Sequence, residues 1–128
     1  MGSFSDYYEN QIINHMLRGQ AFTPPATIYV ALYTTSPTDA GGGTEVSGGS
    51  YARQSVTLSA ASSGATSNSA DVTFPTATAD WGPIVAVGIL DASTSGNLLA
   101  WGALTVSKTV NNGDTFKILA GDLDITVD

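Results

Sequence analysis

The spacing of apolar residues changes once along this chain, from a helical period near the N-terminus to a period of two after the consecutive prolines at positions 24 and 25. Two adjacent prolines disfavour helix and favour extended backbone. In the segment Thr27 to Thr34, Ile28, Val30 and Leu32 share one face of a predicted strand and alternate with Tyr and Ala on the other. No helical pattern returns later, which disfavours a fold that alternates strands and helices.

Further short strands are predicted, and most are separated by Gly, Asn, Asp or Pro. They cover Tyr51 to Leu58, Ala70 to Phe74, Ile84 to Leu90, Leu98 to Leu104, Lys108 to Val110, Thr115 to Leu119 and Leu123 to Val127. Roughly seven or eight short strands with turns between them predict a mainly β fold, namely an antiparallel, jelly-roll-like β-sandwich with one short N-terminal helix.

Two of these strand regions carry more specific signals. Ile84 to Leu90 lacks alternation, so we expect a central strand covered on both faces. Gly88 inside it indicates a bulge or a close backbone approach. The tetrapeptide from Asn111 to Asp114 is typical of a hairpin turn, and it predicts pairing between Lys108–Val110 and Thr115–Leu119.

The predicted helix spans about residues 5–18. Asp6 followed by Glu9 resembles a capping box, and Phe4 is placed as its hydrophobic staple. Arg18 complements the negative end of the helix dipole, and Gly19 is placed to end the helix in a left-handed conformation.

The apolar face of this helix is the first candidate interface. Tyr8, Ile12 and Met16 fall on one face, with Tyr7 and His15 beside it. A helix of about 13 residues is too short to be stable alone in water, so its apolar stripe must pack on something. The domain's own sheet and a neighbouring subunit are the two alternatives.

Composition bounds the class of protein. The 128 residues fit a single domain, 1–128, and only 12% of them are charged, about half the usual share. A surface poor in charge is easier to bury against a partner, because fewer ions lose their hydration. We therefore expect assembly into a homo-oligomer, although a Ser/Thr-rich monomer is an open alternative. The absence of cysteine leaves core packing or neighbouring subunits to stabilise the fold.

Charge and hydropathy also exclude several classes of partner. The net charge is −7 and the four basic residues are scattered, so the clustered cations that nucleic-acid binding requires are missing. No apolar run is long enough to span a membrane. The opening MGSFSDYYENQ is polar and acidic, unlike a signal peptide. We therefore expect assembly in the cytoplasm, with no nucleic-acid or membrane partner.

Two long loops, Thr35 to Ser50 and Ser59 to Asn68, interrupt the strands. The first carries three consecutive glycines and then a Gly-Gly pair, which make it expensive to order by itself. Loops of this length are either mobile linkers or are ordered by a partner, and they often carry binding contacts.

The residues that carry catalysis are nearly absent. The only histidine, His15, lies on the predicted helix, where a partly buried structural or interface role is the simpler interpretation. Asp122 with Asp124, and Asp80 beside Trp81, are the available carboxylates for a glycosidase. The first two alternate along a strand edge and are better explained as a solvated edge that resists aggregation. We therefore predict no enzymatic activity and no catalytic residue.

Cofactor and metal sites are not predicted either. Residues 111–114 offer some oxygen ligands, but calcium needs six or more, and a turn explains this segment better. Trp81 and Trp101 each adjoin a glycine. Core or sheet-face packing is the simpler interpretation for both, and a sugar-stacking platform is the functional one.

Four segments together resemble a family of small tailed-phage virion proteins that are often labelled "phage tail fiber protein". They are FSDYYENQIINHML, PPATIYVALYTTSPTDAGGGTEVSGGSYAR, VTFPTATADWGPIVAVGILDA and GNLLAWGALTVSKTVNNGDTFKILAGDLDITVD. The resemblance spans nearly the whole chain in the same order. It places Tyr29, Leu32, Asp39, Glu45, Tyr51, Arg53, Phe74, Pro75, Gly96 and Leu98 on the family pattern as structural positions. Of these, Asp39, Glu45, Tyr51 and Arg53 are further candidate interface residues.

The resemblance implies a virion structural protein, and three functions are compatible with it. The first is a capsid decoration or cement protein, a homotrimer or other small ring that clamps the phage major capsid protein and stabilises the shell by mass action. The second is a tail fibre, tail-tip or baseplate component that binds other tail proteins and presents its long loops to host receptors. The third is a small glycan depolymerase. A chain with no fibrous repeat is a poor long fibre by itself, which favours the first.

Overall fold

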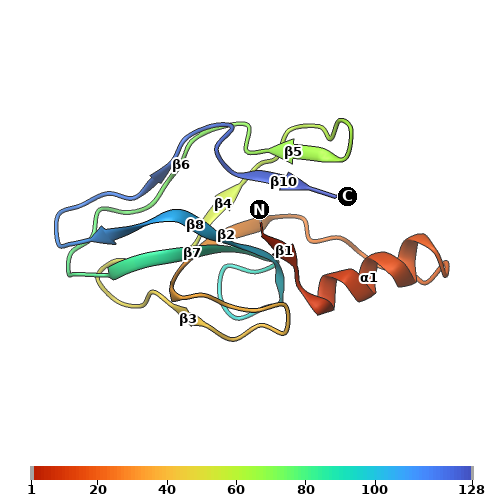
Figure 1. Cartoon of the computed structure of the whole chain (residues 1–128), viewed down its shortest axis with the longest axis horizontal. Helices are drawn as coiled ribbons and strands as arrows, with labels where there is room; N and C mark the ends of the chain where they lie inside the picture. The colour runs from red at the N-terminus through yellow and green to blue at the C-terminus, as the bar shows by residue number, and fades with distance from the viewer. Residues whose placement is uncertain (1, 128) are drawn as a thin grey trace.

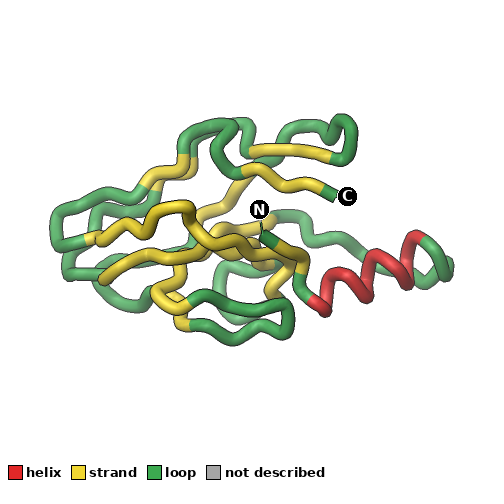
Figure 2. Tube along the Cα trace, in the orientation of Figure 1, coloured by secondary structure: helices red, strands yellow, loops and turns green. Residues whose placement is uncertain are grey.

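The computed structural model describes residues 2–127, and it is built mainly of antiparallel strands with one N-terminal helix (Figures 1 and 2). The elements in chain order are β1 (Ser3–Phe4), α1 (Asp6–Met16), β2 (Ile28–Thr35), β3 (Thr44–Glu45), β4 (Gln54–Val56), β5 (Ala65–Ser67), β6 (Val72–Thr73), β7 (Gly82–Leu90), β8 (Leu98–Val110), β9 (Lys117–Ile118) and β10 (Asp124–Thr126). The predicted fold class is confirmed.

The principal sheet has the strand order β1-β8-β7-β2-β3, and β4 also pairs with β2. All its pairings are antiparallel, with Leu32 opposite Val87 and Gly88 opposite Trp101 near the centre. The strand β7 lies between β2 and β8 and is buried over most of its length. Continuous burial explains why its sequence lacks alternation, as expected for a central strand.

Gly88 permits a close approach, as its position inside a strand predicted. A Cβ atom at this position would lie 2.8 Å from Cε1 of Tyr33 and 3.0 Å from Cδ1 of Leu98. Real Cβ atoms essentially never approach other atoms that closely, so glycine lets the Tyr33 and Leu98 side chains lie directly against the backbone of β7.

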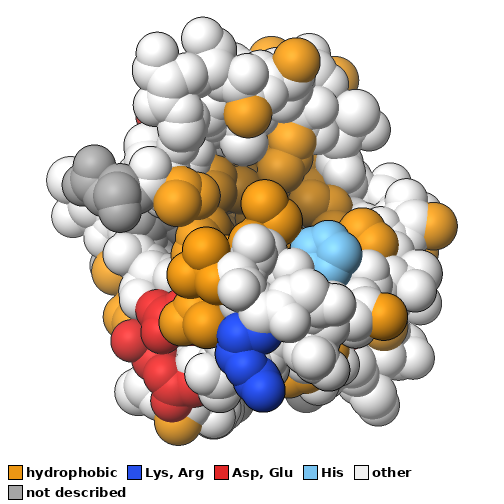
Figure 3. All heavy atoms as spheres, turned by 90° about the vertical axis from the view of Figure 1, so that its right-hand side faces the viewer, with side chains coloured by type: hydrophobic (Ala, Val, Ile, Leu, Met, Phe, Trp, Pro, Cys, Tyr) orange, Lys and Arg blue, Asp and Glu red, His pale blue; other side chains and the backbone are white. Residues whose placement is uncertain are grey.

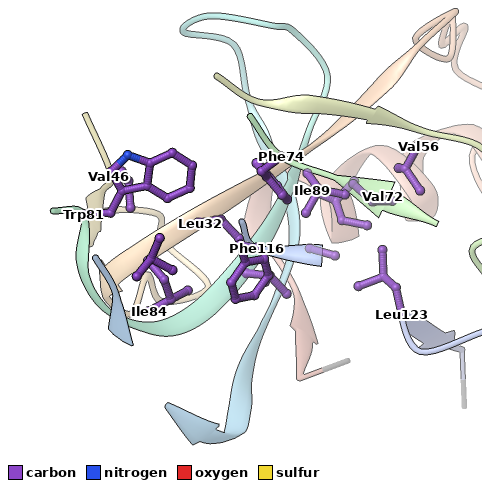
Figure 4. Close-up of a cluster of buried hydrophobic side chains, with 14 of the residues drawn as sticks. Leu32, Val46, Val56, Val72, Phe74, Trp81, Ile84, Ile89, Phe116 and Leu123 are labelled. Carbon is purple, nitrogen blue, oxygen red and sulfur yellow. The ribbon is translucent and has the colours of Figure 1, made fainter. Parts of the chain in front are cut away.

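Two small ribbons, β6–β9 and β5–β10, form the second layer. Their side chains meet one face of the principal sheet in the main core (Figure 4), where Phe74 stacks on Tyr51 and contacts Phe116 edge-on. A smaller cluster of Ala31, Tyr33, Ala86 and Leu90 lies apart from that core. The second layer is therefore two short ribbons and not one continuous sheet.

A buried amide ties the two ribbons together. Asn68 accepts hydrogen bonds from the backbone N–H groups of Gly121 and Leu123 and donates to the carbonyls of Ala70 and Leu119. All its polar atoms are thus used although the residue is only 2% exposed. A buried polar group is tolerated only when its partners are present, so Asn68 fixes the turn between β9 and β10.

Two strand predictions are corrected. Leu98–Leu104 and Lys108–Val110 belong to one strand, β8, whose register against β7 shifts where residues 104–107 bulge out. The turn at residues 111–114 forms, with Asp114 N–H bonded to the Asn111 carbonyl, but β9 pairs with β6 and not with β8. The physical reason is that Phe116 is drawn into the core, which carries the chain away from β8 after the turn.

The helix is shorter than predicted and its cap is different. The N-cap is Ser5, not Asp6, and its Oγ accepts a hydrogen bond from Tyr8 N–H at 3.1 Å. Phe4 packs edge-on against Tyr8 as the expected apolar contact. Beyond the C-cap, Gly19 has φ +68°, the left-handed conformation predicted for it.

Of the two alternatives for the apolar face of the helix, packing on its own sheet holds only in part. No residue of α1 is buried, and the helix projects from one end of the sheets (Figure 1). Tyr8 contacts Phe4 and packs against the main core, and the rings of Tyr8 and His15 also lie near Phe22, which follows the helix. Of the predicted apolar stripe, Met16 is therefore exposed, whereas Tyr8 and Ile12 are half-buried.

The two long loops are ordered by the chain itself, which corrects the expectation that they are mobile or need a partner. The first contains β3, the fully buried Pro37 and a tight turn in which Thr38 and Gly41 exchange backbone hydrogen bonds. Gly43 is required there, since its φ is +75° and an added Cβ would lie 2.7 Å from the Thr35 carbonyl oxygen. The second loop supplies β5, which pairs with β10.

The aromatic core generates a first prediction. Phe74 is 1% exposed, so Phe74→Ala should lower the free energy of unfolding by about 3–5 kcal/mol through lost burial and a residual cavity. Urea denaturation followed by tryptophan fluorescence would measure the change. Leu119→Ala, at a half-exposed site, is the control and should change stability by less than about 0.5 kcal/mol. Equal effects of the two variants would contradict the assigned core.

Candidate interface

The helix carries five of the predicted interface residues, and the structure separates them into two groups. Tyr8 and Ile12 are half-buried, and Tyr8 packs against the main core, whereas Tyr7, His15 and Met16 are exposed. Ile13 and Leu17, which flank these residues in the sequence, are exposed as well. Met16 is 70% and Leu17 81% exposed. Figure 3 looks at this end of the molecule and shows hydrophobic side chains gathered around a hollow.

His15 is not the partly buried residue that the sequence suggested. Its side chain is exposed, and Nδ1 lies 2.9 Å from the carbonyl oxygen of Gln20. This contact folds the residues after the helix back against its last turn. His15 therefore stabilises the chain locally, next to the exposed apolar residues of the helix. It has no carboxylate partner in the described part of the chain.

Asp39 joins the first long loop to the helix and to β8. Its carboxylate accepts a hydrogen bond from Trp101 Nε1 at 2.8 Å, and its carbonyl accepts one from Asp6 N–H at 2.8 Å. The half-buried Trp101 is thus engaged by the chain itself. Its contacts favour the packing interpretation of this tryptophan over the sugar platform.

Glu45, Tyr51 and Arg53 converge into one network, although they come from different segments. Arg53 forms a bidentate pair with Glu45, from Nη2 to Oε1 at 2.8 Å and from Nε to Oε2 at 2.9 Å. Tyr51 donates its hydroxyl to the same carboxylate at 2.7 Å and accepts from Leu32 N–H at 3.0 Å. The side chain of Arg53 is 9% exposed and that of Glu45 24%.

The other end of Arg53 reaches a third segment. Its Nη1 donates to the carbonyls of Ala92 and Ser95, both at 2.8 Å, so one guanidinium holds the connection between β7 and β8. Bidentate pairing with a carboxylate is a use of arginine that lysine cannot reproduce. These candidate interface residues turn their polar atoms inward, in accord with the structural role that the resemblance implies.

Burial and pairing shift the pKa values of this network. Burial alone would raise the pKa of Glu45, but the hydrogen bonds from Arg53 and Tyr51 outweigh it and leave that pKa below its usual value. Burial and the neighbouring carboxylate raise the pKa of Tyr51, and they raise that of Tyr33 as well. The hydrogen bond to Glu45 raises the pKa of Arg53. Glu45 is therefore ionised and both tyrosines are neutral at pH 7.

The remaining candidate residues do not form a common site. Asp80 accepts a hydrogen bond from Asn112 N–H, which fixes the turn at residues 111–114. Trp81 is buried and donates to the Gly49 carbonyl at 2.9 Å, as a core residue. Asp122 and Asp124 are exposed and line a cavity of about 480 Å³ between β8 and β9. Among residues 2–127, no three His, Asp or Glu side chains are placed to hold a metal ion.

The ionic network generates a second prediction. A carboxyl whose pKa is lower in the folded than in the unfolded chain stabilises the fold above its unfolded pKa, about 4.3 for glutamate, and this contribution disappears as the pH falls through the folded-state pKa. Glu45→Gln should therefore lower the free energy of unfolding at pH 7 by about 2–3 kcal/mol, somewhat less than the 3–5 kcal/mol of a fully buried pair. Urea denaturation of the natural chain and of Glu45→Gln between pH 3 and 7 would measure both free energies of unfolding. The difference between them should become smaller as the pH falls.

The exposed pair of Lys117 and Asp71 provides the matched control. Their charged atoms are 3.7 Å apart and both side chains are 46% exposed. Asp71→Asn should change stability by less than about 1 kcal/mol at every pH. A Glu45→Gln variant that behaves like this control would show that the network contributes nothing to stability.

Comparison with known proteins places the chain in a family. Within the described residues, no helix is both long and apolar enough to cross a membrane. No curated protein matches the chain. A family model described as "Podophage GP4 fiber I protein gp80" matches residues 3–126, in accord with the resemblance seen in the sequence motifs. The chain therefore belongs to this family of podophage fiber proteins and is a structural protein of the phage virion.

Proposed function

We propose that the chain is a non-enzymatic structural subunit of the phage tail fibre, built into the virion through contacts with other virion proteins or with further copies of itself. The observation that carries the proposal is the family match over residues 3–126, whose description names a fiber protein. That description fits the tail better than the capsid, so it favours the tail-fibre alternative over the capsid decoration function that the sequence placed first.

The way the chain orders its own loops supports a building role. Arg53 forms hydrogen bonds that join three segments of the chain, and Asp39 joins the first long loop to α1 and β8. Asn68 holds the end of the second long loop. A module whose loops are fixed before assembly loses little conformational entropy when it is incorporated. Both tryptophan N–H groups are bonded internally, so we do not assign these residues to host glycans.

The location in the virion tests the proposal directly. Gold-labelled antibodies against the chain, viewed on intact virions by electron microscopy, should mark the tail, and gel densitometry should give a low copy number. Label over the head together with a very high copy number would overturn the tail assignment in favour of capsid decoration. If the protein decorates the capsid, virions that lack it should lose heat resistance. If it is a tail subunit, virions that lack it should lose host adsorption.

The absence of catalysis is a third prediction. Asp80→Asn, Asp122→Asn, Asp124→Asn and His15→Gln should each leave incorporation into virions and infectivity unchanged, because these side chains are dispersed and exposed. The purified chain should release no reducing sugar from host polysaccharide. Sugar release by the natural chain that is lost in a folded variant would show that the protein is a depolymerase.

A further inference from the structure

Asn112 is the only asparagine of the chain that is followed by glycine. Asparagine is thermolabile, and it loses ammonia most readily before glycine, because glycine has no Cβ to shield its backbone nitrogen. All residues of the turn 111–114 are exposed to solvent, so water reaches the amide. The chain therefore carries a reactive amide in the turn that follows β8.

Deamidation at this position needs only groups of the chain and water. The backbone nitrogen of Gly113 gives up its proton and attacks Cγ of Asn112, so that a new N–C bond forms. The bond from Cγ to Nδ2 breaks, and Nδ2 leaves with the proton as ammonia. Water then opens the resulting succinimide ring at either carbonyl, which gives aspartate or isoaspartate. Both products carry a carboxylate in place of a neutral amide.

The fold engages the nitrogen that has to attack. Gly113 N–H donates to the carbonyl of Ala77 at 2.7 Å, and Ala77 is 1% exposed and belongs to the main core. Ala77 in turn donates its own N–H to the carbonyl of Asp114 at 2.9 Å. While this pair of bonds persists, the Gly113 nitrogen keeps its proton directed at Ala77. The succinimide can therefore form only after the turn separates from Ala77.

Two carboxylates hold the turn in the same closed form. Asp80 Oδ1 accepts a hydrogen bond from Asn112 N–H at 2.8 Å, and Asp114 Oδ2 accepts one from Asn111 N–H at 2.9 Å. Gly113 has φ +93°, which other residues adopt only with strain. The turn thus requires glycine at the position that makes Asn112 reactive, and the bonds to residues 77–80 offset that reactivity.

We propose that Asn112 is a deamidation site of this chain and that the bonds between the turn and residues 77–80 suppress the reaction in the folded protein. The rate then follows the fraction of chains whose turn is open. A structural protein of a virion is not replaced after assembly, so a change that accumulates with time matters more than in a protein that a cell renews. The reaction is the same whether the subunit lies in the tail or on the capsid.

A carboxylate at position 112 disfavours reclosure of the turn. The carboxylates of Asp80 and Asp114 already accept the backbone N–H groups of residues 112 and 111, so the new charge lies near two charges of the same sign. Repulsion between them destabilises the closed form. Isoaspartate also lengthens the main chain by a carbon atom, which displaces Gly113 N–H from its acceptor. The modified turn should therefore open more often than the original one.

The rates in the folded and the unfolded chain test the proposal. The full chain is incubated at mildly alkaline pH with and without guanidinium chloride. Trypsin, which cleaves after Lys108 and Lys117, then releases residues 109–117 for fragmentation by mass spectrometry. Asn112 should react at least about tenfold more slowly in the folded chain, and Asn111 in the same peptide should react far less than Asn112 in guanidinium chloride. Equal rates at Asn112 in the two states, or reaction at Asn111 in place of Asn112, would overturn the proposal.

Removal of one bond to the turn tests how the reaction is suppressed. Asp80→Ala should speed deamidation of the folded chain about threefold or more, because the closed turn loses a hydrogen bond, and should leave the rate in guanidinium chloride unchanged. Asp71→Ala is the matched control, since Asp71 is also exposed and accepts a backbone N–H, that of Ala120, at 2.8 Å. Tryptophan fluorescence during melting would show that both variants fold. A folded Asp80→Ala chain that reacts at the rate of the control would contradict the assigned suppression.

Asn112→Asp reproduces one product and tests its effect on the turn. The variant should melt at a lower temperature, and its Gly113 N–H should exchange faster with deuterated solvent in NMR spectra. Adding Asp80→Asn should reverse part of both changes, because asparagine removes one charge and keeps an acceptor oxygen. Unchanged exchange at Gly113 in Asn112→Asp would show that the modified turn stays closed and would overturn the expected opening.

Discussion

The fold depends on the burial of the β2–β7 pair on both of its faces. Val30, Ala31 and Leu32 are consecutive and fully buried, although neighbouring residues of a strand point to opposite faces. Neither face can therefore be left to water. The ribbons β6–β9 and β5–β10 cover one face, and the cluster around Tyr33 and Leu90 fills the other.

Tyr51 links this apolar requirement to the polar network. Its ring is stacked on Phe74 and meets Trp81 edge-on, while its hydroxyl bonds Glu45 and the backbone of Leu32. The same side chain thus contributes to the core and orients the carboxylate that pairs with Arg53. A network with all its partners present rigidifies the structure around it. This explains how a glycine-rich loop that is expensive to order becomes part of a fixed surface.

Patterns that are local in sequence predicted the elements best. Alternation in Thr27 to Thr34 and continuous apolarity in Ile84 to Leu90 located β2 and β7, and the apolar period located the helix. The sequence missed what depends on distant partners: the two-residue strands β1 and β3, the pairing of β9 with β6, and the network that joins Glu45 to Arg53. The N-cap role of Ser5 could have been predicted from the sequence, because a serine directly before an acidic first turn is a common N-cap.

The candidate interface shows the same division between local pattern and tertiary context. The apolar stripe of the helix is visible in the sequence, but whether it meets its own sheet depends on the direction in which the helix leaves β1. Hydrogen bonds from Ser5 to Leu98 and from Asp6 to Asp39 fix that direction and anchor only the first turn. The last turn has no comparable anchor, and helix formation is cooperative over a few turns. The helix is therefore fixed to the rest of the fold at its first turn, and its exposed end is held by local contacts such as that between His15 and the Gln20 carbonyl.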